Sequence, residues 1–136
     1  MSNITLDYLK NNIPPHAAVV GRIKSWLDSG ESRLPVSCTV MSVEDSMEGT
    51  DGIEQSWVFT SHGLRNAAGI SLDLSKLRGK DEENGKGLVS SGAASFSLVY
   101  SQLNEILRRG GTYKNGGVSL YLDHDHPDLE EFLNMT

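Results

Sequence analysis

A helix, a glycine-rich loop and a strand follow one another between Gly87 and Asp123, and this succession most constrains the fold. The helix is predicted by apolar residues at three-and-four spacing: Phe96, Val99, Tyr100, Leu103, Ile106 and Leu107. Arg108 and Arg109 form a basic last turn before Gly110 and Gly111, which predicts where the helix stops. After a loop containing Lys114, a strand is predicted by alternating apolar residues: Val118, Leu120 and Leu122.

The rest of the chain repeats this alternation of strands and helices. Helices are predicted at 6–10, 19–27, 53–66 and from Pro127 onward, and strands at 36–43 and 69–77. The charged, glycine-rich segment 78–92 has no periodicity and is predicted to be a mobile loop. The order favours an α/β fold with about three mostly parallel strands, preceded by short N-terminal helices. Such a sheet normally has both faces covered, and this chain offers little material for that.

Composition sets outer limits on the class of protein. The 136 residues suit one hydrophobic core, and the net charge of -6 argues against a general nucleic-acid or anionic-membrane surface. No apolar run approaches the roughly 20 residues that span a bilayer. The single cysteine excludes an internal disulfide, and the N-terminus lacks the order of a signal peptide. We therefore expect a cytoplasmic protein that binds neither nucleic acid nor membrane.

Two local clusters suggest chemistry that their spacing disfavours. Five residues separate Gly79 from Gly85-Lys86 where a phosphate-binding P-loop has four, and no Ser or Thr follows the lysine. The run Asp123, His124, Asp125, His126 and Asp128 contains possible zinc or iron ligands. Neighbouring donors on one strand end point to opposite faces, so capping of the helix at Pro127 is the better interpretation, and we expect no metal site.

Residues at the strand ends suggest two further sites. Cys38 is interpreted first as a buried small hydrophobe beside Val36 and Val40, and second as a reactive thiol. Asp45 and Arg78 lie where open α/β sheets commonly bind ligands. Arg78 could fork onto a phosphate and Asp45 could accept from a ribose hydroxyl or a base amine, although scattered surface charge explains the spacing as well.

Three blocks in order carry a resemblance to a known family: PVSCTVMSVEDSMEG, RNAAGISLDLSKLRG, and the stretch from Gly87 to Asn134. They resemble the large, catalytic subunit of ribonucleotide reductase, over Leu34 to Asn134. The resemblance implies a partial reductase barrel with specificity-site elements at 34–136, after a helical segment at 1–33. It matches the front part of that barrel and leaves open the diiron-dependent and cobalamin-dependent branches.

The resemblance also implies residue roles. Cys38 matches the redox cysteine that reduces the ribose and becomes half of a disulfide, and Ser37 beside it would contact the substrate. Asp45 matches the aspartate that contacts the specificity effector, a deoxynucleoside triphosphate (dNTP), and Arg78 the arginine that holds its phosphates. Segments 79–91 and 110–117 would be the two specificity loops. The second loop contains Gly110, Gly111 and Lys114, the last competing with Tyr113 as its basic residue.

Partners and cofactors follow from the same resemblance. Helices 53–66 and 93–109 would pair with their copies in a homodimer, with Tyr100 and Ile106 on the second apolar edge of the longer helix. The radical generator of the complete enzyme, a diiron partner subunit or adenosylcobalamin, has no site on this chain. A radical cysteine and a partner for Cys38 are expected on further reductase polypeptide, so the isolated chain is not expected to be catalytic.

Three hypotheses from different classes remain. The chain is a component of a possibly split reductase, a stand-alone dimeric module that binds deoxynucleotides, or a repurposed remnant without nucleotide function. Restored deoxynucleotide formation on mixing with the rest of the enzyme would favour the first, and heat of binding with dATP, dGTP or dTTP the second. A structure in which Asp45 and Arg78 face away from each other and no dimer buries the two main helices would favour the third.

Overall fold

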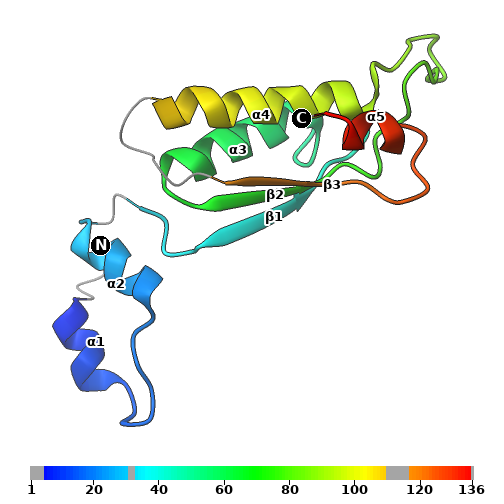
Figure 1. Cartoon of the computed structure of the whole chain (residues 1–136). Coiled ribbons are helices and arrows are strands. Elements are labelled where there is room, and N and C mark those ends of the chain that lie inside the picture. Colours follow the sequence, from blue (N-terminus) through cyan, green and yellow to red (C-terminus); the bar gives the residue numbers. More distant parts are fainter. Residues whose placement is uncertain (1–4, 31–32, 110–116, 136) are drawn as a thin grey trace.

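The computed structural model describes residues 5–30, 33–109 and 117–135, and its elements alternate as the sequence predicts (Figure 1). The helices are α1 (Leu6–Asn12), α2 (Gly21–Asp28), α3 (Ile53–Arg65), α4 (Gly92–Arg109) and α5 (Leu129–Leu133). The strands are β1 (Cys38–Ser42), β2 (Gly69–Asp73) and β3 (Val118–Tyr121). Among the described residues, none of these helices combines the length and the apolar character that crossing a membrane requires.

The three strands form one parallel sheet in the order β1-β2-β3. Cys38 is in register with Gly69, and Ile70 is in register with Val118. Parallel neighbours need a crossover, and the sequence supplies α3 between β1 and β2 and α4 between β2 and β3. The predicted α/β class and the parallel pairing are therefore confirmed.

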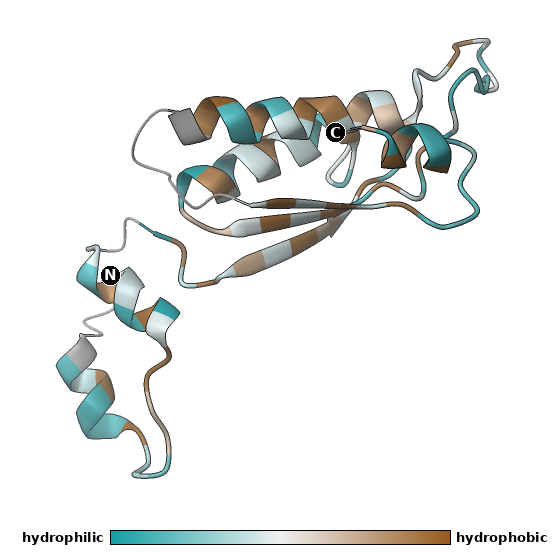
Figure 2. Ribbon diagram, viewed as in Figure 1, coloured by the Kyte–Doolittle hydropathy of each residue, from teal (hydrophilic) through white to brown (hydrophobic). Residues whose placement is uncertain are grey.

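Both long helices cover the same face of the sheet (Figure 1). The alternation of β2 explains this, because Ile70 and Leu72 are buried beneath the helices while their neighbours Ser71 and Asp73 point the other way. Figure 2 shows the corresponding alternation of hydrophobic and polar bands along the strands. The core is a single cluster on the helix side, in which Val43, Leu64 and Leu74 are almost completely buried. The sheet is thus a half-covered layer.

Helices α3 and α4 are held to each other by a buried polar contact. The hydroxyls of Tyr100 and Ser56 lie 2.6 Å apart, and Ser56 Oγ also donates to the carbonyl of Ile53 at 2.5 Å. Burial raises the pKa of Tyr100 above its ordinary value, and the hydrogen bond between Tyr100 and Ser56 offsets part of that rise. Tyr100 is fully buried within the chain. Core packing therefore accounts for Tyr100, whereas Ile106 is 65% exposed and lies on the surface.

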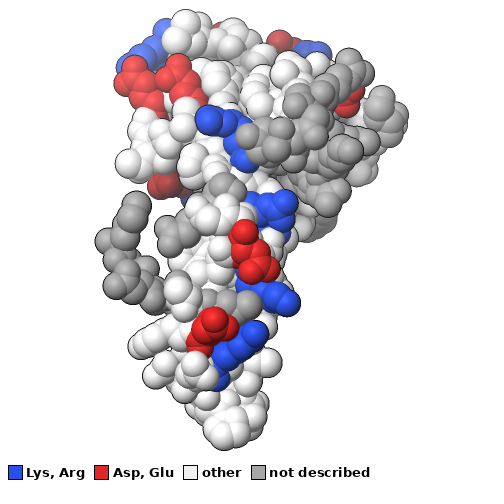
Figure 3. All heavy atoms as spheres, turned by 90° about the vertical axis from the view of Figure 1, so that its left-hand side faces the viewer, with Lys and Arg blue, Asp and Glu red and all other residues white. Residues whose placement is uncertain are grey.

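The N-terminal helices lie apart from the sheet (Figure 1). Helix α1 is capped by Thr5, whose hydroxyl accepts from the amide of Tyr8 at 3.1 Å, and α2 buries no residue. A long hydrogen bond from Arg22 Nε to Ser37 Oγ, at 3.4 Å, connects α2 with the approach to β1. Figure 3, which looks onto this end of the molecule, shows basic and acidic side chains interspersed.

Candidate functional site

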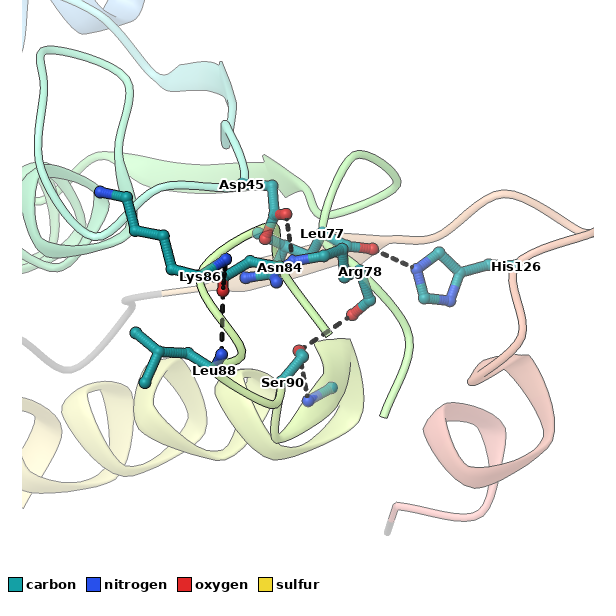
Figure 4. A network of polar contacts seen from close by, with 9 residues as sticks. Asp45, Leu77, Arg78, Asn84, Lys86, Leu88, Ser90 and His126 are labelled. Carbon is teal, nitrogen blue, oxygen red and sulfur yellow. Dashed lines mark hydrogen bonds and ion pairs between the residues drawn. The ribbon is translucent and has the colours of Figure 1, made fainter. Parts of the chain in front are cut away.

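Asp45 and Arg78 lie together at the carboxyl end of the sheet, just beyond β1 and β2. Because β1 and β2 are parallel, the segments that follow them both leave from the carboxyl ends of the strands. Asp45 and Arg78 therefore lie at the same end of the sheet, although they are far apart in sequence. Arg78 Nε donates to Asp45 Oδ2 at 2.5 Å, and the two side chains are 28% and 30% exposed (Figure 4). A second ion pair, between Lys76 and Glu44, links the same two segments at the surface. The hydrogen bond to Glu44 raises the pKa of Lys76.

A tight turn between β1 and α3 positions Asp45. The amide of Glu44 donates to the carbonyl of Asp51 at 2.8 Å, and the amide of Ile53 donates to the carbonyl of Ser46 at 2.8 Å. A side chain at Gly52 would place its Cβ 2.4 Å from the carbonyl oxygen of Glu48, so the turn closes only with glycine there. The turn therefore joins Asp45 directly to the first turn of α3.

The segment after Arg78, predicted as a mobile loop without periodic structure, contains a short hairpin, and its mobility stays a prediction. Glu83 and Val89 form an antiparallel bridge. Asn84 Oδ1 accepts from the amides of Lys86 and Leu88, each at 2.9 Å, and so closes the turn (Figure 4). Periodicity could not indicate this hairpin because a single bridge is too short to produce a pattern; the signal available in the sequence was the Asn-Gly-Lys-Gly turn.

A cavity of about 630 Å³ opens between the Asp45 turn, the hairpin and α4. Its charged lining has two cations, Arg78 and Lys86, and two carboxylates, Asp45 and Glu48. Leu88 and Phe96 contribute apolar surface. The Nη1 atom of Arg78 is buried without a hydrogen-bond partner among the described residues. The volume falls within the range of about 300 to 1,000 Å³ that small-molecule sites occupy. An anionic ligand with an apolar or aromatic part suits this combination of groups.

Cys38 lies on the uncovered face of the sheet, so its interpretation as a buried hydrophobe was wrong. Its thiol is free and exposed, and Val40 on the same face is 74% exposed. The alternation of β1 was recognised, but the apolar character of Val36 and Val40 suggested the wrong face as the buried one. In the neighbouring strand, a Cβ at Gly69 would lie 3.2 Å from Cys38 Sγ. The absence of a side chain at Gly69 leaves the thiol its room.

Ser37 does not line the Asp45–Arg78 cavity. Ser37 is exposed, and its hydroxyl accepts the long hydrogen bond from Arg22 already described, while its carbonyl accepts from the amide of Gly69 at 2.8 Å. Gly110, Gly111 and Lys114 lie outside the described residues.

The Asp and His run after β3 has a role that its sequence did not predict. Asp128 caps α4 by accepting from the amide of Ala93 at 2.7 Å, and it makes no side-chain capping bond to α5. The predicted capping of the helix at Pro127 was therefore wrong in its target, and α5 begins at Leu129. His126 is also engaged, with Nε2 2.7 Å from the carbonyl oxygen of Leu77. Among the described residues, no three His, Cys, Asp or Glu side chains converge to hold a metal ion.

Comparison with known proteins decides the family. Residues 36–136 match the model of the ribonucleotide reductase barrel domain. The chain belongs to this family. Its partial reductase barrel accounts for a parallel sheet with one open face, since the strands of a closed barrel turn that face inward.

Several proteins illustrate the similarity. The vitamin B12-dependent ribonucleotide reductase of Agrobacterium fabrum is 29% identical over 114 residues, which cover 84% of this chain and 9% of that protein. The corresponding Streptomyces coelicolor protein is 30% identical, covering 79% of this chain and 11% of its own length. The ribonucleoside-diphosphate reductase large subunit of an African swine fever virus isolate is 27% identical, covering 97% and 16%. The chain thus spans a small part of each relative.

A solved structure shares the reductase fold. The class Id ribonucleotide reductase alpha subunit of Actinobacillus ureae superposes with a TM-score of 0.64, covering 86% of this chain and 20% of that one. At 21% identity the likeness concerns the fold alone.

Proposed function

We propose that this chain supplies the deoxynucleotide effector site and the redox thiol of a ribonucleotide reductase large subunit. The observation that carries the proposal is the Asp45–Arg78 pair at the edge of the 630 Å³ cavity. The family resemblance implies effector contacts for the same two residues. A repurposed remnant was expected to show Asp45 and Arg78 facing away from each other and no dimer through the two main helices, and the first of these features is not observed.

Different residues of the cavity are suited to bind the phosphates, the ribose and the base of a nucleotide. A guanidinium has five N–H donors, and the Asp45 contact uses the one on Nε. The Nη groups carry the other four donors, of which Nη1 is buried without a partner, and we propose that a phosphate bound in the cavity pairs with them. Asp45 keeps acceptor capacity for a ribose hydroxyl or a base amine. Phe96 and Leu88 supply apolar surface for the base, and Lys86 supplies a second cation for the phosphates.

Calorimetry of the full chain with dATP, dGTP and dTTP tests this site. Arg78→Ala removes a charge-assisted contact worth about 1.5 to 3 kcal/mol, so the dissociation constant should rise about 10- to 150-fold. Arg33→Ala is the matched control, because Arg33 donates to Ser25 at 2.9 Å and lies outside the cavity. Absence of heat with all three nucleotides at millimolar concentration would refute the effector site.

The second part of the proposal concerns Cys38. On the open face, its thiol is accessible to a ligand inside a closed barrel, and Gly69 leaves space beside the sulfur. With a second thiol from elsewhere in the enzyme, two S–H bonds break as the disulfide forms, and their two electrons and two protons go to the ribose. One ribose C–O bond breaks, a C–H bond replaces it, and the hydroxyl leaves as water. Ser37 precedes this thiol and would contact the substrate. Cys38→Ser in the assembled enzyme should abolish turnover and leave effector binding unchanged.

Assembly with further reductase polypeptide forms the last part. Strands β1 and β3 are the edges of the described sheet, where additional barrel strands can pair. On α3 and α4, the exposed apolar side chains of Val58, Leu98 and Ile106 suit a homodimer through these helices. Because relatives such as the Agrobacterium protein are named vitamin B12-dependent, we expect adenosylcobalamin as the radical source. Restored deoxynucleotide formation on mixing with the complementary reductase part would support this assembly.

A stand-alone nucleotide-binding module is the alternative function. One observation favours it: every group assigned above to the effector cavity lies within this chain. Effector binding without any restoration of catalysis by the complementary part would favour the module.

A further inference from the structure

We infer that His126, Pro127 and Asp128, together called the clamp, position Arg78 for its ligand and connect it to the first turn of α4. The inference rests on the proposed function for the identity of that ligand. It assigns a role to the part of the Asp and His run that neither metal binding nor capping of α5 explains. The clamp residues are positioning residues, because they act through the main chain on both sides of Arg78.

The first contact fixes the residue before Arg78. The carbonyl of Leu77 can only accept, so His126 Nε2 must carry the hydrogen in their 2.7 Å contact (Figure 4). The amide of Asp128 can only donate, so His126 Nδ1 must accept in the 3.1 Å contact between them. The ring therefore has one tautomer, with both nitrogens used. His126 is 9% exposed, which keeps water from competing for either bond.

The second contact fixes the residues after Arg78. Asp128 Oδ1 accepts from the amide of Lys80 at 2.9 Å, and Asp128 is 6% exposed. Pro127 packs on Gly79, where an added Cβ would come within 2.5 Å of the proline Cγ. The main chain is thus held immediately before and after Arg78 by one short segment from the other end of the chain.

The third contact extends the clamp to α4. Asp128 Oδ2 accepts from the amide of Ala93 at 2.7 Å, so one carboxylate joins the Arg78 segment to the start of that helix. Ser90 strengthens the link, since its hydroxyl donates to the carbonyl of Arg78 at 3.3 Å and accepts from the amide of Gly92 at 3.0 Å. Because α4 also supplies Phe96 to the cavity, the clamp sets the distance between the cation and the apolar wall.

Asp128→Asn and His126→Phe test the inference, and the same run supplies matched controls. Asp125→Asn and His124→Phe make identical changes at exposed positions close by. In Asp128→Asn, an amide NH₂ must face one of two backbone N–H donors. The amides of Lys80 and Ala93 should then exchange hydrogen about ten-fold faster than in the Asp125→Asn control.

The decisive readouts follow Arg78 itself in the full chain. The NMR signal of Arg78 Nε–H should lose order and exchange protection in both clamp variants and in neither control. The dATP dissociation constant should rise about ten-fold in Asp128→Asn. In an Arg78→Ala background the same change should alter that constant less than about two-fold, because the clamp acts through the arginine.

A core truncation distinguishes positioning from general destabilisation. Leu64→Ala removes a buried side chain of α3 and should lower stability while leaving the Arg78 Nε–H signal ordered at temperatures where the chain stays folded. An equal loss of order in Leu64→Ala and Asp128→Asn would overturn the inference, as would an unchanged Nε–H signal in the clamp variants. If the unmodified chain binds no dNTP, the proposed function fails, and the Nε–H comparison still decides whether the clamp orders Arg78.

Discussion

Gly63→Ala tests the close contact between α3 and β2. Gly63 lies inside α3, where alanine normally stabilises a helix by about 1 kcal/mol relative to glycine. Here an added Cβ would fall 2.1 Å from Ile70 Cδ1 and 3.1 Å from Ile70 Cγ1. Ile70 is 2% exposed, so it has little room to yield. Overpacking of this kind costs about 1 to 3 kcal/mol, which equals or exceeds the gain in helix propensity.

The expected net effect is a loss of up to about 2 kcal/mol in the free energy of unfolding. Ile70→Val removes Cδ1 and leaves only the 3.1 Å contact. In the Ile70→Val background, the effect of Gly63→Ala on the free energy of unfolding should change sign, so that the substitution stabilises by up to about 1 kcal/mol. The Ile70→Val change alone should cost about 0.5 to 1.5 kcal/mol.

Urea unfolding of the four proteins, followed by far-UV circular dichroism, gives these free energies by linear extrapolation. A stabilising Gly63→Ala in both backgrounds would refute the direct packing of α3 on β2. Since the Asp45 turn runs straight into α3, displacement of that helix would also move Asp45 relative to Arg78.

Two further predictions concern the core and the thiol. Above pH 10 an unfolded chain loses the Tyr100 proton while the folded chain, with its raised pKa, keeps it, so the free energy of unfolding should fall from about pH 10 upward. Tyr100→Phe should flatten this fall and should itself cost about 1 kcal/mol of stability, because the hydrogen bond to Ser56 is lost. An unchanged dependence of stability on pH in Tyr100→Phe would contradict a buried hydroxyl at this position. Gly69→Ala places a Cβ 3.2 Å from Cys38 Sγ and should slow alkylation of the Cys38 thiol by iodoacetamide several-fold. Gly117→Ala is the control, because its Cβ would have no atom within 4 Å and should leave the rate unchanged. Equal alkylation rates in the two variants would contradict a close approach of residue 69 to the thiol.

The hairpin and the clamp account for what local pattern could not predict. Asn84 holds the hairpin through two hydrogen bonds from its side chain to backbone amides within four residues. The Asn-Gly turn that makes these bonds was overlooked because the segment is rich in charged residues and glycine. The partners of Asp128 lie 35 and 48 residues away in the chain, so spacing within the Asp and His run gives no information about them. Buried acceptors find whichever backbone donors the fold leaves unpaired, and local spacing does not identify those donors.

Sequence alone determined the alternation of helices and strands, the parallel α/β class and the family. Hydrophobic periodicity, the Gly and Pro residues that end an element, and motifs in a fixed order can all be recognised along the chain without knowing the tertiary contacts. It also selected Asp45 and Arg78 as a pair to examine. Only the tertiary structure decided that the Cys38 side of β1 is the open one. Each strand alternates two faces, and which face is buried depends on where the crossover helices pack. The cavity beside Arg78 arises in the same way, from segments that meet only after folding.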